Sequence, residues 1–425
     1  MQEAIAYGTM IMTLGLVLSR PRIGLRAQVT PGIAAALGVV VLLATGIVSP
    51  ADLSAGCGAL WRPSLTIASI MLTTNAAQRL GILDYFADLI EPRAGQPIGR
   101  LFGSVFALSA ATSAALNNDA AVLLLTPLVV QLIRRRCPDR SDLVIPFSFA
   151  VFSAAGVAPL VISNPMNLIV ADYAGIGFNE YAARMIPIAV AGWITTFLVL
   201  RVFFHRQLNS VIAGTESARA PRLSRPGRQF LGLLVVALGC YPALSYAGGP
   251  VWAVAVASAG LGVLLCRRYR IAPIRQILAT VSWEILIFLF CVFVIVLGLR
   301  NAGLVGRIAD VYSSATDTAM QIAVIGILSA LGSAVLNNHP MAILNALAIR
   351  NLDGTHQLVL AALVGGDLGP RLLPMGSLAG LLWLDSLRRL GVRISLSRFI
   401  LIGLAVTVPT LGLSLIILFF GGLPA

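Results

Sequence analysis

The stretch SAALNN at residues 113–118 returns as SAVLNN at residues 333–338, with five of six residues identical. Downstream, the pair Pro165-Met166 returns as Pro374-Met375. In both places polar residues interrupt long apolar runs. Paired interruptions in corresponding positions of two halves are typical of secondary transporters built from inverted repeats, with the transport site between the repeats near the membrane midplane.

The composition agrees with a membrane protein. Of 425 residues, 58% are hydrophobic and 11% are charged, which is too apolar for soluble domains. All 30 basic residues are arginine, and the absence of lysine excludes a phosphate-binding P-loop and Schiff-base chemistry. The five cysteines and three histidines show no metal-ligand spacing, so neither a metal site nor a cofactor is predicted.

Arginine-rich loops alternate with arginine-free ones along the chain. The positive-inside rule then places both termini outside the cell membrane, the inner membrane of a bacterium or archaeon, and residues 205–228 inside as a linker. The arginine-free PADLSAG, residues 50–56, is expected to be an outer loop between spans at about 29–48 and 63–78. The excess of arginine reflects orientation in the lipid bilayer, and no nucleic-acid partner is expected.

We therefore predict an all-α polytopic membrane protein of about ten transmembrane helices, two re-entrant hairpins and two broken helices. Each half is expected to contain one hairpin and one broken helix, at the places where polar residues interrupt an apolar run. Non-helical backbone at membrane depth is tolerated only inside protein or beside water, so these places should lie in the protein interior or at a water-filled cavity. The predicted ranges are 1–204 for the first repeat, with its hairpin at about 101–133 and broken helix at about 143–174, and 229–425 for the second, with its hairpin at about 319–349 and broken helix at about 357–385.

Uncharged polar residues gather at these hairpin tips and breaks. Asparagine side chains and the backbone N–H groups of a helix start suit an oxygen-rich ligand without requiring charge. The alternative is that they only cap helices and form turns. The predicted substrate-binding residues are Asn117, Asn118, Ser163, Asn164, Asn167, Asn337, Asn338, Gly376 and Ser377.

Three ionisable residues near these positions are candidates for proton coupling. Asp119 and Asp367 are acids at membrane depth, where ionisable groups are costly and mark ion or proton pathways. His339 occupies the hairpin position that corresponds to Asp119. The alternatives are a helix N-cap for Asp119, an ion pair with Arg371 for Asp367, and capping or packing for His339.

The motifs ALNNDAAVLLLTPLV, PLVISNPMNLIVADYAGIGFNEYA, LRNAGL, LNNHPMAIL and GGDLGPRLLPMGSLAGLLWL resemble the arsenical pump membrane protein family nearly from end to end. This resemblance implies export of arsenite and antimonite in exchange for protons, in some members with a soluble cytoplasmic ATPase. It also implies two hairpins and two broken helices. The chain departs from the family pattern at Ala120, where glycine is frequent, and at His339, where methionine is frequent.

Two other functions are compatible with some of these features. A sodium- or proton-coupled carrier of carboxylates or other anions would share the fold of this superfamily. A membrane-embedded enzyme is less consistent with the sequence, which lacks HExxH, GxSxG and paired-carboxylate signatures.

Overall fold

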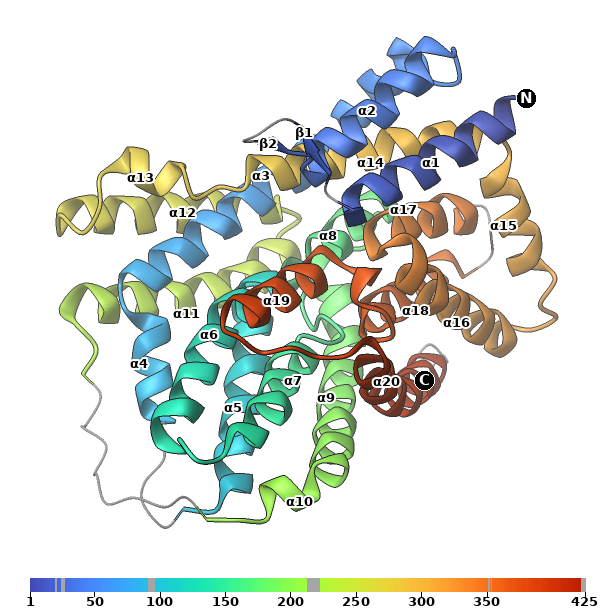
Figure 1. The fold of residues 1–425 in the computed structure, drawn as a ribbon. Helices are drawn as coiled ribbons and strands as arrows, with labels where there is room; N and C mark the ends of the chain where they lie inside the picture. Colours follow the sequence, from blue (N-terminus) through green and yellow to red (C-terminus); the bar gives the residue numbers. More distant parts are fainter. Residues whose placement is uncertain are drawn as a thin grey trace.

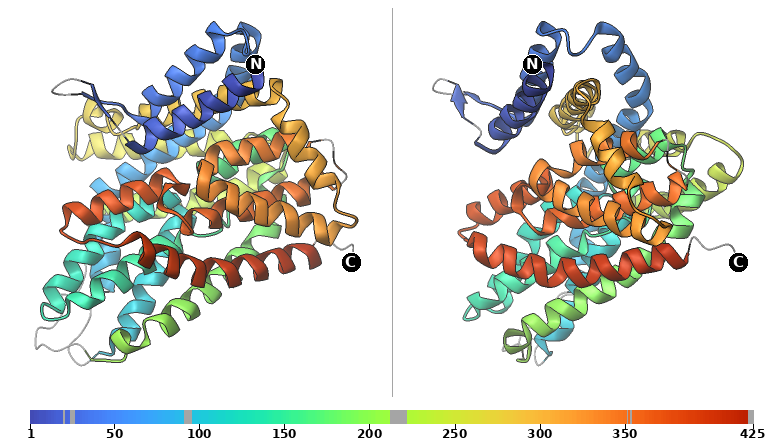
Figure 2. Two further views of the ribbon diagram at one scale, coloured as in Figure 1. Left: turned by 45° about the vertical axis from the view of Figure 1, so that its right-hand side comes forward. Right: turned by 90° about the vertical axis from the view of Figure 1, so that its right-hand side faces the viewer.

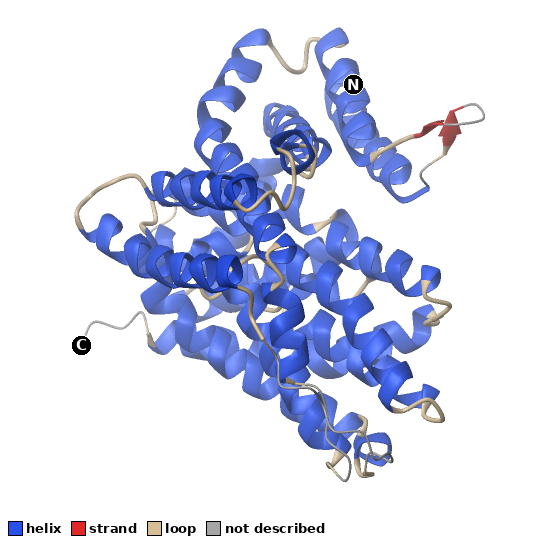
Figure 3. Cartoon of the chain, turned by 90° about the vertical axis from the view of Figure 1, so that its left-hand side faces the viewer, coloured by secondary structure: helices blue, strands red, loops and turns tan. Residues whose placement is uncertain are grey.

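The computed structural model describes residues 1–19, 21–23, 27–90, 96–211, 222–350, 352 and 354–421. Almost all of this is helical; a small antiparallel pair, β1 (Arg22–Ile23) and β2 (Ala27–Gln28), projects at one edge (Figure 3). Within the described residues, seven helices are long and apolar enough to cross a membrane. The predicted fold class, an all-α polytopic membrane protein, is confirmed.

The first half of the chain runs from the N-terminus to the predicted linker (Figure 1). Its helices are α1 (Gln2–Ser19), α2 (Pro31–Ala44), α3 (Pro50–Arg79), α4 (Ile82–Leu89), α5 (Ile98–Ala115), α6 (Asn118–Arg136), η1 (Ser141–Leu143), α7 (Val144–Ala154), η2 (Val161–Ser163), α8 (Pro165–Ala174), α9 (Phe178–Phe203) and α10 (His205–Leu208).

The second half repeats this order of long, short, paired and interrupted helices. Its helices are α11 (Arg225–Tyr246), α12 (Val251–Arg268), α13 (Ile274–Leu278), α14 (Trp283–Asn301), α15 (Leu304–Ser313), α16 (Thr318–Leu336), α17 (Asn338–Ile349), α18 (Thr355–Leu368), η3 (Gly369–Arg371), η4 (Pro374–Gly376), α19 (Leu378–Arg389) and α20 (Leu396–Phe420).

Helices of the two halves pack reciprocally. Helix α2 packs on α14 while α12 packs on α3, and α6 packs on α19 while α8 packs on α17. The final helices of the halves, α9 and α20, run side by side (Figure 2). This exchange of partners makes α3 the counterpart of α14 and α2 the counterpart of α12. The repeat boundaries and the inverted orientation of the halves in the membrane stay predictions.

Helices α5 and α6 form hairpin 1, and α16 and α17 form hairpin 2, close to the predicted ranges. Helices α7 and α8 are separated by residues 155–164, named break 1. Helices α18 and α19 are separated by residues 369–377, named break 2. Pro165 occupies the first turn of α8, where its missing N–H costs nothing, so the helix restarts there.

One predicted boundary is wrong. PADLSAG is not a loop, because α3 already begins at Pro50 and continues for 30 residues. Ser49 accepts a hydrogen bond from the Asp52 N–H, and the Asp52 carboxylate accepts one from the Ser49 N–H. This capping box satisfies backbone donors at the helix start, so the absence of arginine indicated membrane side but not a helix end.

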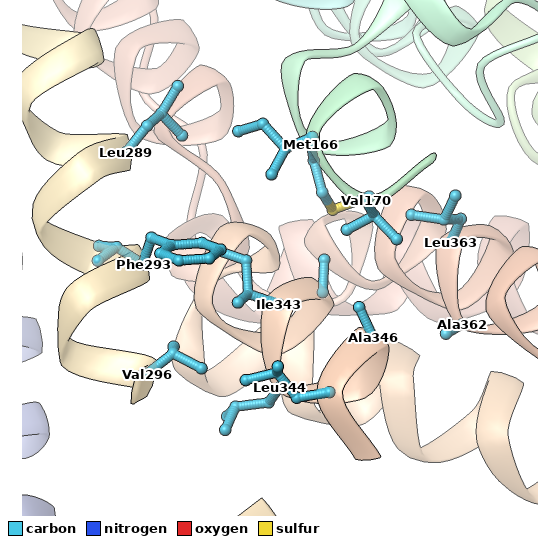
Figure 4. Close-up of a cluster of buried hydrophobic side chains, with 14 of the residues drawn as sticks. Met166, Val170, Leu289, Phe293, Val296, Ile343, Leu344, Ala346, Ala362 and Leu363 are labelled. Atoms are coloured by element: carbon cyan, nitrogen blue, oxygen red, sulfur yellow. The ribbon is translucent and has the colours of Figure 1, made fainter. Parts of the chain in front are cut away.

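Apolar contacts hold α8 against the second half. Figure 4 shows Met166 and Val170 of α8 near Ile343 of α17 and Leu363 of α18, all within one buried cluster. A side chain at Gly366 of α18 would place its Cβ 3.0 Å from Met166 Cε. The second half thus provides the surface on which the first broken helix rests.

Candidate functional site

The carboxylate of Asp367, in the second half of the chain, reaches into break 1 of the first half. Its Oδ1 accepts a hydrogen bond from Asn164 Nδ2 at 2.7 Å. Its Oδ2 accepts two, from the Ala158 N–H at 2.9 Å and from Asn167 Nδ2 at 2.9 Å. Asp367 is buried, with 6% of its surface exposed. Three donors from break 1 and the first turn of α8 therefore hold one carboxylate at the junction of the halves.

Tyr181 of α9 extends this network. Asn167 Nδ2 also donates to the Tyr181 hydroxyl at 2.6 Å, and that hydroxyl donates to the Ala158 carbonyl at 3.0 Å. Sequence reasoning missed Tyr181, because it lies in α9, outside the hairpins and breaks whose polar residues were predicted to form the site. Its hydroxyl fixes both the amide of Asn167 and the backbone of break 1.

Arg371 contacts the other side of the interrupted helix. Its guanidinium donates to the carbonyl oxygen of Ser153, in the last turn of α7, and to Thr196 Oγ1 at 3.3 Å. A cation is stabilised at a helix C-terminus and an anion near a helix start. The cation of Arg371 thus lies at the C-terminus of α7, and the anion of Asp367 lies near the N-terminus of α8. Each charge is opposite in sign to the partial charge of the helix end beside it.

The alternative that Asp367 forms an ion pair with Arg371 is wrong. No ion pair joins Asp367 to Arg371 in the described part of the chain, although Arg371 is buried and only four residues away. Each charged group is instead compensated by polar groups of the first half.

The tip of hairpin 1 is tied to the same break. Asn118 accepts a hydrogen bond from the Ser113 hydroxyl and donates to the Gly156 carbonyl at 3.3 Å. Ser163 donates to the Ala114 carbonyl at 2.9 Å. Hairpin 1, break 1 and Asp367 therefore form one connected polar region.

Asp119 differs from Asp367 in having no partner. The N-cap of α6 is Asn117, whose Oδ1 accepts from the Ala120 N–H at 3.1 Å, so the alternative that Asp119 caps the helix is wrong. Asp119 is partly buried and makes no hydrogen bond or ion pair with any residue that the structure describes. An ionised carboxylate at membrane depth normally requires such compensation.

Hairpin 2 and break 2 form a second polar group. Asn337 caps α17 through the His339 N–H at 3.3 Å, contacts His339 Nδ1 at 3.2 Å, and donates to the Met375 carbonyl at 3.3 Å. Ser377 caps α19 through the Gly380 N–H at 3.0 Å. Asn337 has φ of 79°, which strains a residue with a side chain. Strain held at a hairpin tip is typical of a functional or moving segment.

Gly376 has a packing role. A Cβ there would lie 2.6 Å from Pro370 Cα and 3.1 Å from the Ser333 carbonyl oxygen. Only glycine allows break 2 to approach α16 this closely, which brings the backbone of the break against hairpin 2.

Several buried polar atoms have no hydrogen-bond partner among the described residues. Four of them lie on α8, α16 and α17, of which α17 packs on both others. They are Asn167 Oδ1, Ser333 Oγ, Asn338 Oδ1 and His339 Nε2. Buried polar atoms are nearly always hydrogen-bonded, so these are candidates to bind a solute that can both donate and accept.

Comparison with known proteins identifies the family. The family model described as arsenical pump membrane protein matches residues 5–421. The chain belongs to the arsenical pump membrane protein family. The arsenical pump membrane protein of Escherichia coli is 30% identical over 97% of each chain, and the putative arsenical pump membrane protein of Bacillus subtilis is 27% identical over 87% of this chain and 89% of that protein.

A solved structure shares the fold of this family member. The Alcanivorax borkumensis YdaH transporter, whose crystal structure is described as having an unusual topology, aligns with a TM-score of 0.62 over 99% of both chains at 15% identity. Together the family and the helices confirm the coarser prediction, a multi-pass membrane transport protein.

In this arsenical pump family member the predicted site residues fall into two groups. Asn118, Ser163, Asn164, Asn167 and Asp367 meet around break 1, and Asn337, His339, Gly376 and Ser377 lie around hairpin 2 and break 2. The alternative role of capping is confirmed for Asn117, Asn164, Asn337 and Ser377. Substrate binding and proton coupling stay predictions for all of them.

Proposed function

We propose that this protein is a secondary transporter that exports trivalent arsenic and antimony from the cytoplasm in exchange for protons, giving resistance to these metalloids. The observation that carries the proposal is the hydrogen-bonded carboxylate of Asp367, which joins the second half of the chain to break 1 of the first. A polar centre built from both halves is what alternating access requires. The family supplies the class of substrate.

The chemistry of the site supports a neutral, hydroxyl-rich substrate. Arsenous acid is small and mostly uncharged at neutral pH, so each of its hydroxyls can donate and accept. The unpartnered oxygens of Asn167, Ser333 and Asn338 match such a molecule without a cationic clamp. Both terminal nitrogens of Arg371 donate to the protein itself, which leaves the guanidinium less suited to a two-point grip on an anion.

Asp119 is our candidate for the group that exchanges protons. Among the described residues it makes no hydrogen bond or ion pair, whereas Asp367 already accepts three hydrogen bonds. Loss of a proton from Asp119 would therefore favour a rearrangement of hairpin 1 that supplies a partner. A ligand that binds one arrangement better than the other shifts the population, and this couples the proton to transport.

Everted membrane vesicles provide the test. With the vesicle lumen made acidic, wild-type vesicles should accumulate arsenite and antimonite, and an uncoupler should abolish the accumulation. Sodium gradients and added ATP, without other soluble proteins, should have no effect. Sodium-driven uptake that is indifferent to arsenite would instead select an anion carrier, and stimulation by ATP only after a soluble ATPase is added would reveal such a partner.

A further inference from the structure

Helix α3 is unusually polar for its position. At 30 residues it is long enough to cross a bilayer, but it is too polar to be among the seven apolar candidate spans, because it carries Arg62, Asn75 and several hydroxyl side chains. Its counterpart α14 reads WEILIFLFCVFVIVLGLRN and is apolar over most of its length. Polar groups on a membrane-spanning helix face protein or water, so this asymmetry indicates what α3 faces.

A large open cavity lies beside the middle of α3. It encloses about 770 Å³. Its wall includes Trp61, Arg62 and Thr66 of α3, Val161 of break 1, and loop residues 248–250. Our topology prediction places that loop outside the membrane, so this cavity, named the outer vestibule, connects the exterior with break 1.

A second, smaller cavity lies further along α3, on the other side of break 1. It encloses about 30 Å³ beneath the tip of hairpin 1, between Thr73 of α3, Leu116 of the tip and Ile162 of break 1. Val161 lines the first cavity and Ile162 the second, so one short segment, η2, separates them. Helix α3 packs against η2 and runs past both cavities.

A row of hydroxyl side chains on α3 runs from Thr66, which lines the first cavity, to Thr73, which lines the second. Thr66, Ser69 and Thr73 are spaced three and four residues apart, which places them on one helix face, and their exposed fractions are 2%, 5% and 8%. Each hydroxyl donates to a carbonyl of its own helix, at 2.9, 2.8 and 2.9 Å. Each oxygen keeps a lone pair with which it can accept a hydrogen bond from a passing solute.

We propose that the α3 face bearing Thr66, Ser69 and Thr73 lines the route between the outer vestibule and the hairpin 1 tip for a neutral, hydroxyl-rich solute. The identity of the solute rests on the proposed function, whereas the route does not. The corresponding cavity beneath hairpin 2, of about 20 Å³, is bounded on the α14 side by Phe288 and Val292, which offer no acceptor, and its polar lining comes from Thr13 of α1 and the tip residue Asn337. Of the two counterpart helices α3 alone carries a line of hydroxyls along its cavity, so the route follows α3.

Thiol accessibility tests the route without requiring transport. In a background with all five cysteines replaced by alanine, Thr66→Cys and Thr73→Cys should react with a membrane-impermeant maleimide added to intact cells, Thr73→Cys more slowly. The matched control is Val292→Cys on α14, which lines the corresponding cavity and should stay unlabelled. Failure of Thr73→Cys to react, or equal reaction at Val292→Cys, overturns the route.

Transport measurements test the route independently of thiol labelling. The double variant Thr66→Val and Thr73→Val should lower the initial rate of arsenite uptake into everted vesicles about tenfold, because two hydrogen-bond acceptors along the route are lost. Thr195→Val on α9, whose hydroxyl also bonds its own helix, is the control and should not change the rate. If wild-type vesicles do not transport arsenite, the proposed function fails while the labelling still decides the route. If the wild type transports and the double variant matches it, the route is wrong.

Discussion

Replacing Asp367 by asparagine should weaken the junction between the halves. The carboxylate accepts three hydrogen bonds, two on Oδ2 and one on Oδ1. Asparagine has a single acceptor oxygen, so if that oxygen keeps the bonds from Ala158 and Asn167, its amide nitrogen must face the Nδ2 donor of Asn164. One hydrogen bond to a charged group is lost, worth about 1.5–3 kcal/mol, and one buried donor stays unpaired at a further cost of about 1–3 kcal/mol.

A loss of about 3 kcal/mol corresponds to roughly 150-fold in the equilibrium between the assembled and the opened junction. Purified Asp367→Asn protein in detergent should therefore unfold at a clearly lower temperature than the wild type, and transport in vesicles should fall strongly. The control is Asp385→Asn, which removes a half-exposed ion pair with Arg389 and should cost less than about 1 kcal/mol. An Asp367→Asn protein with the thermal midpoint and uptake rate of the wild type would refute the hydrogen-bonded junction.

Three further predictions follow from the same geometry. Asp119→Asn should leave thermal stability unchanged, because Asp119 bonds to no residue in the described part of the chain, but should abolish arsenite accumulation driven by an acidic vesicle lumen; equal accumulation would remove its proton role. Asn117→Ala should cost about 1 kcal/mol of stability through loss of the α6 cap, measured by thermal unfolding against Asp119→Ala, which should cost less. Gly365→Ala should prevent normal packing of α18 on α16, because its Cβ would overlap the carbonyl oxygen of Gly326, and yield of folded protein in membranes should drop sharply unless the helices separate.

The hairpins and broken helices could be predicted because two physical signals coincide. Polar residues inside apolar runs are costly in a membrane, so LNN at residues 116–118 and its repeat mark places where backbone must meet protein or water. Arginine then predicts which loops share a side of the membrane. The hairpins lie at residues 98–136 and 318–349, within three residues of the predicted ends.

The partners within the site could not be predicted in the same way. Asp367 and Arg371 are four residues apart, a spacing that in a regular helix favours an ion pair. The chain leaves α-helical geometry at Gly369, and each side chain instead reaches a different end of break 1. The partners of Asp367 and Arg371 depend on how one half of the chain docks on the other. Residue spacing within one half therefore does not predict them.

The two hairpins also differ in how firmly they are held. Asn345 of hairpin 2 is fully buried, accepts a hydrogen bond from the Tyr312 hydroxyl at 2.6 Å, and donates to Ser329 Oγ at 2.9 Å. Ser329 in turn donates to the Ala362 carbonyl of α18. In hairpin 1 the positions 220 residues earlier are Leu125, which corresponds to Asn345, and Ser109, which corresponds to Ser329. The Ser109 hydroxyl donates to the Val105 carbonyl of its own helix. Side-chain hydrogen bonds therefore tie hairpin 2, but not hairpin 1, to its neighbours at this level.

Asn345→Leu gives hairpin 2 the residue found in hairpin 1 and should loosen it. The Tyr312 hydroxyl would lose its acceptor, at about 1–3 kcal/mol for a buried group left unpaired. Ser329 would lose one donor but keep its bond to the Ala362 carbonyl, and burial of the larger apolar side chain would offset part of the cost. Hydrogen exchange of the α17 amides should become faster by at least about tenfold, while Tyr312→Phe, which removes one bond and leaves no unpaired hydroxyl, should have a smaller effect. Unchanged exchange in α17 would show that apolar packing alone holds hairpin 2.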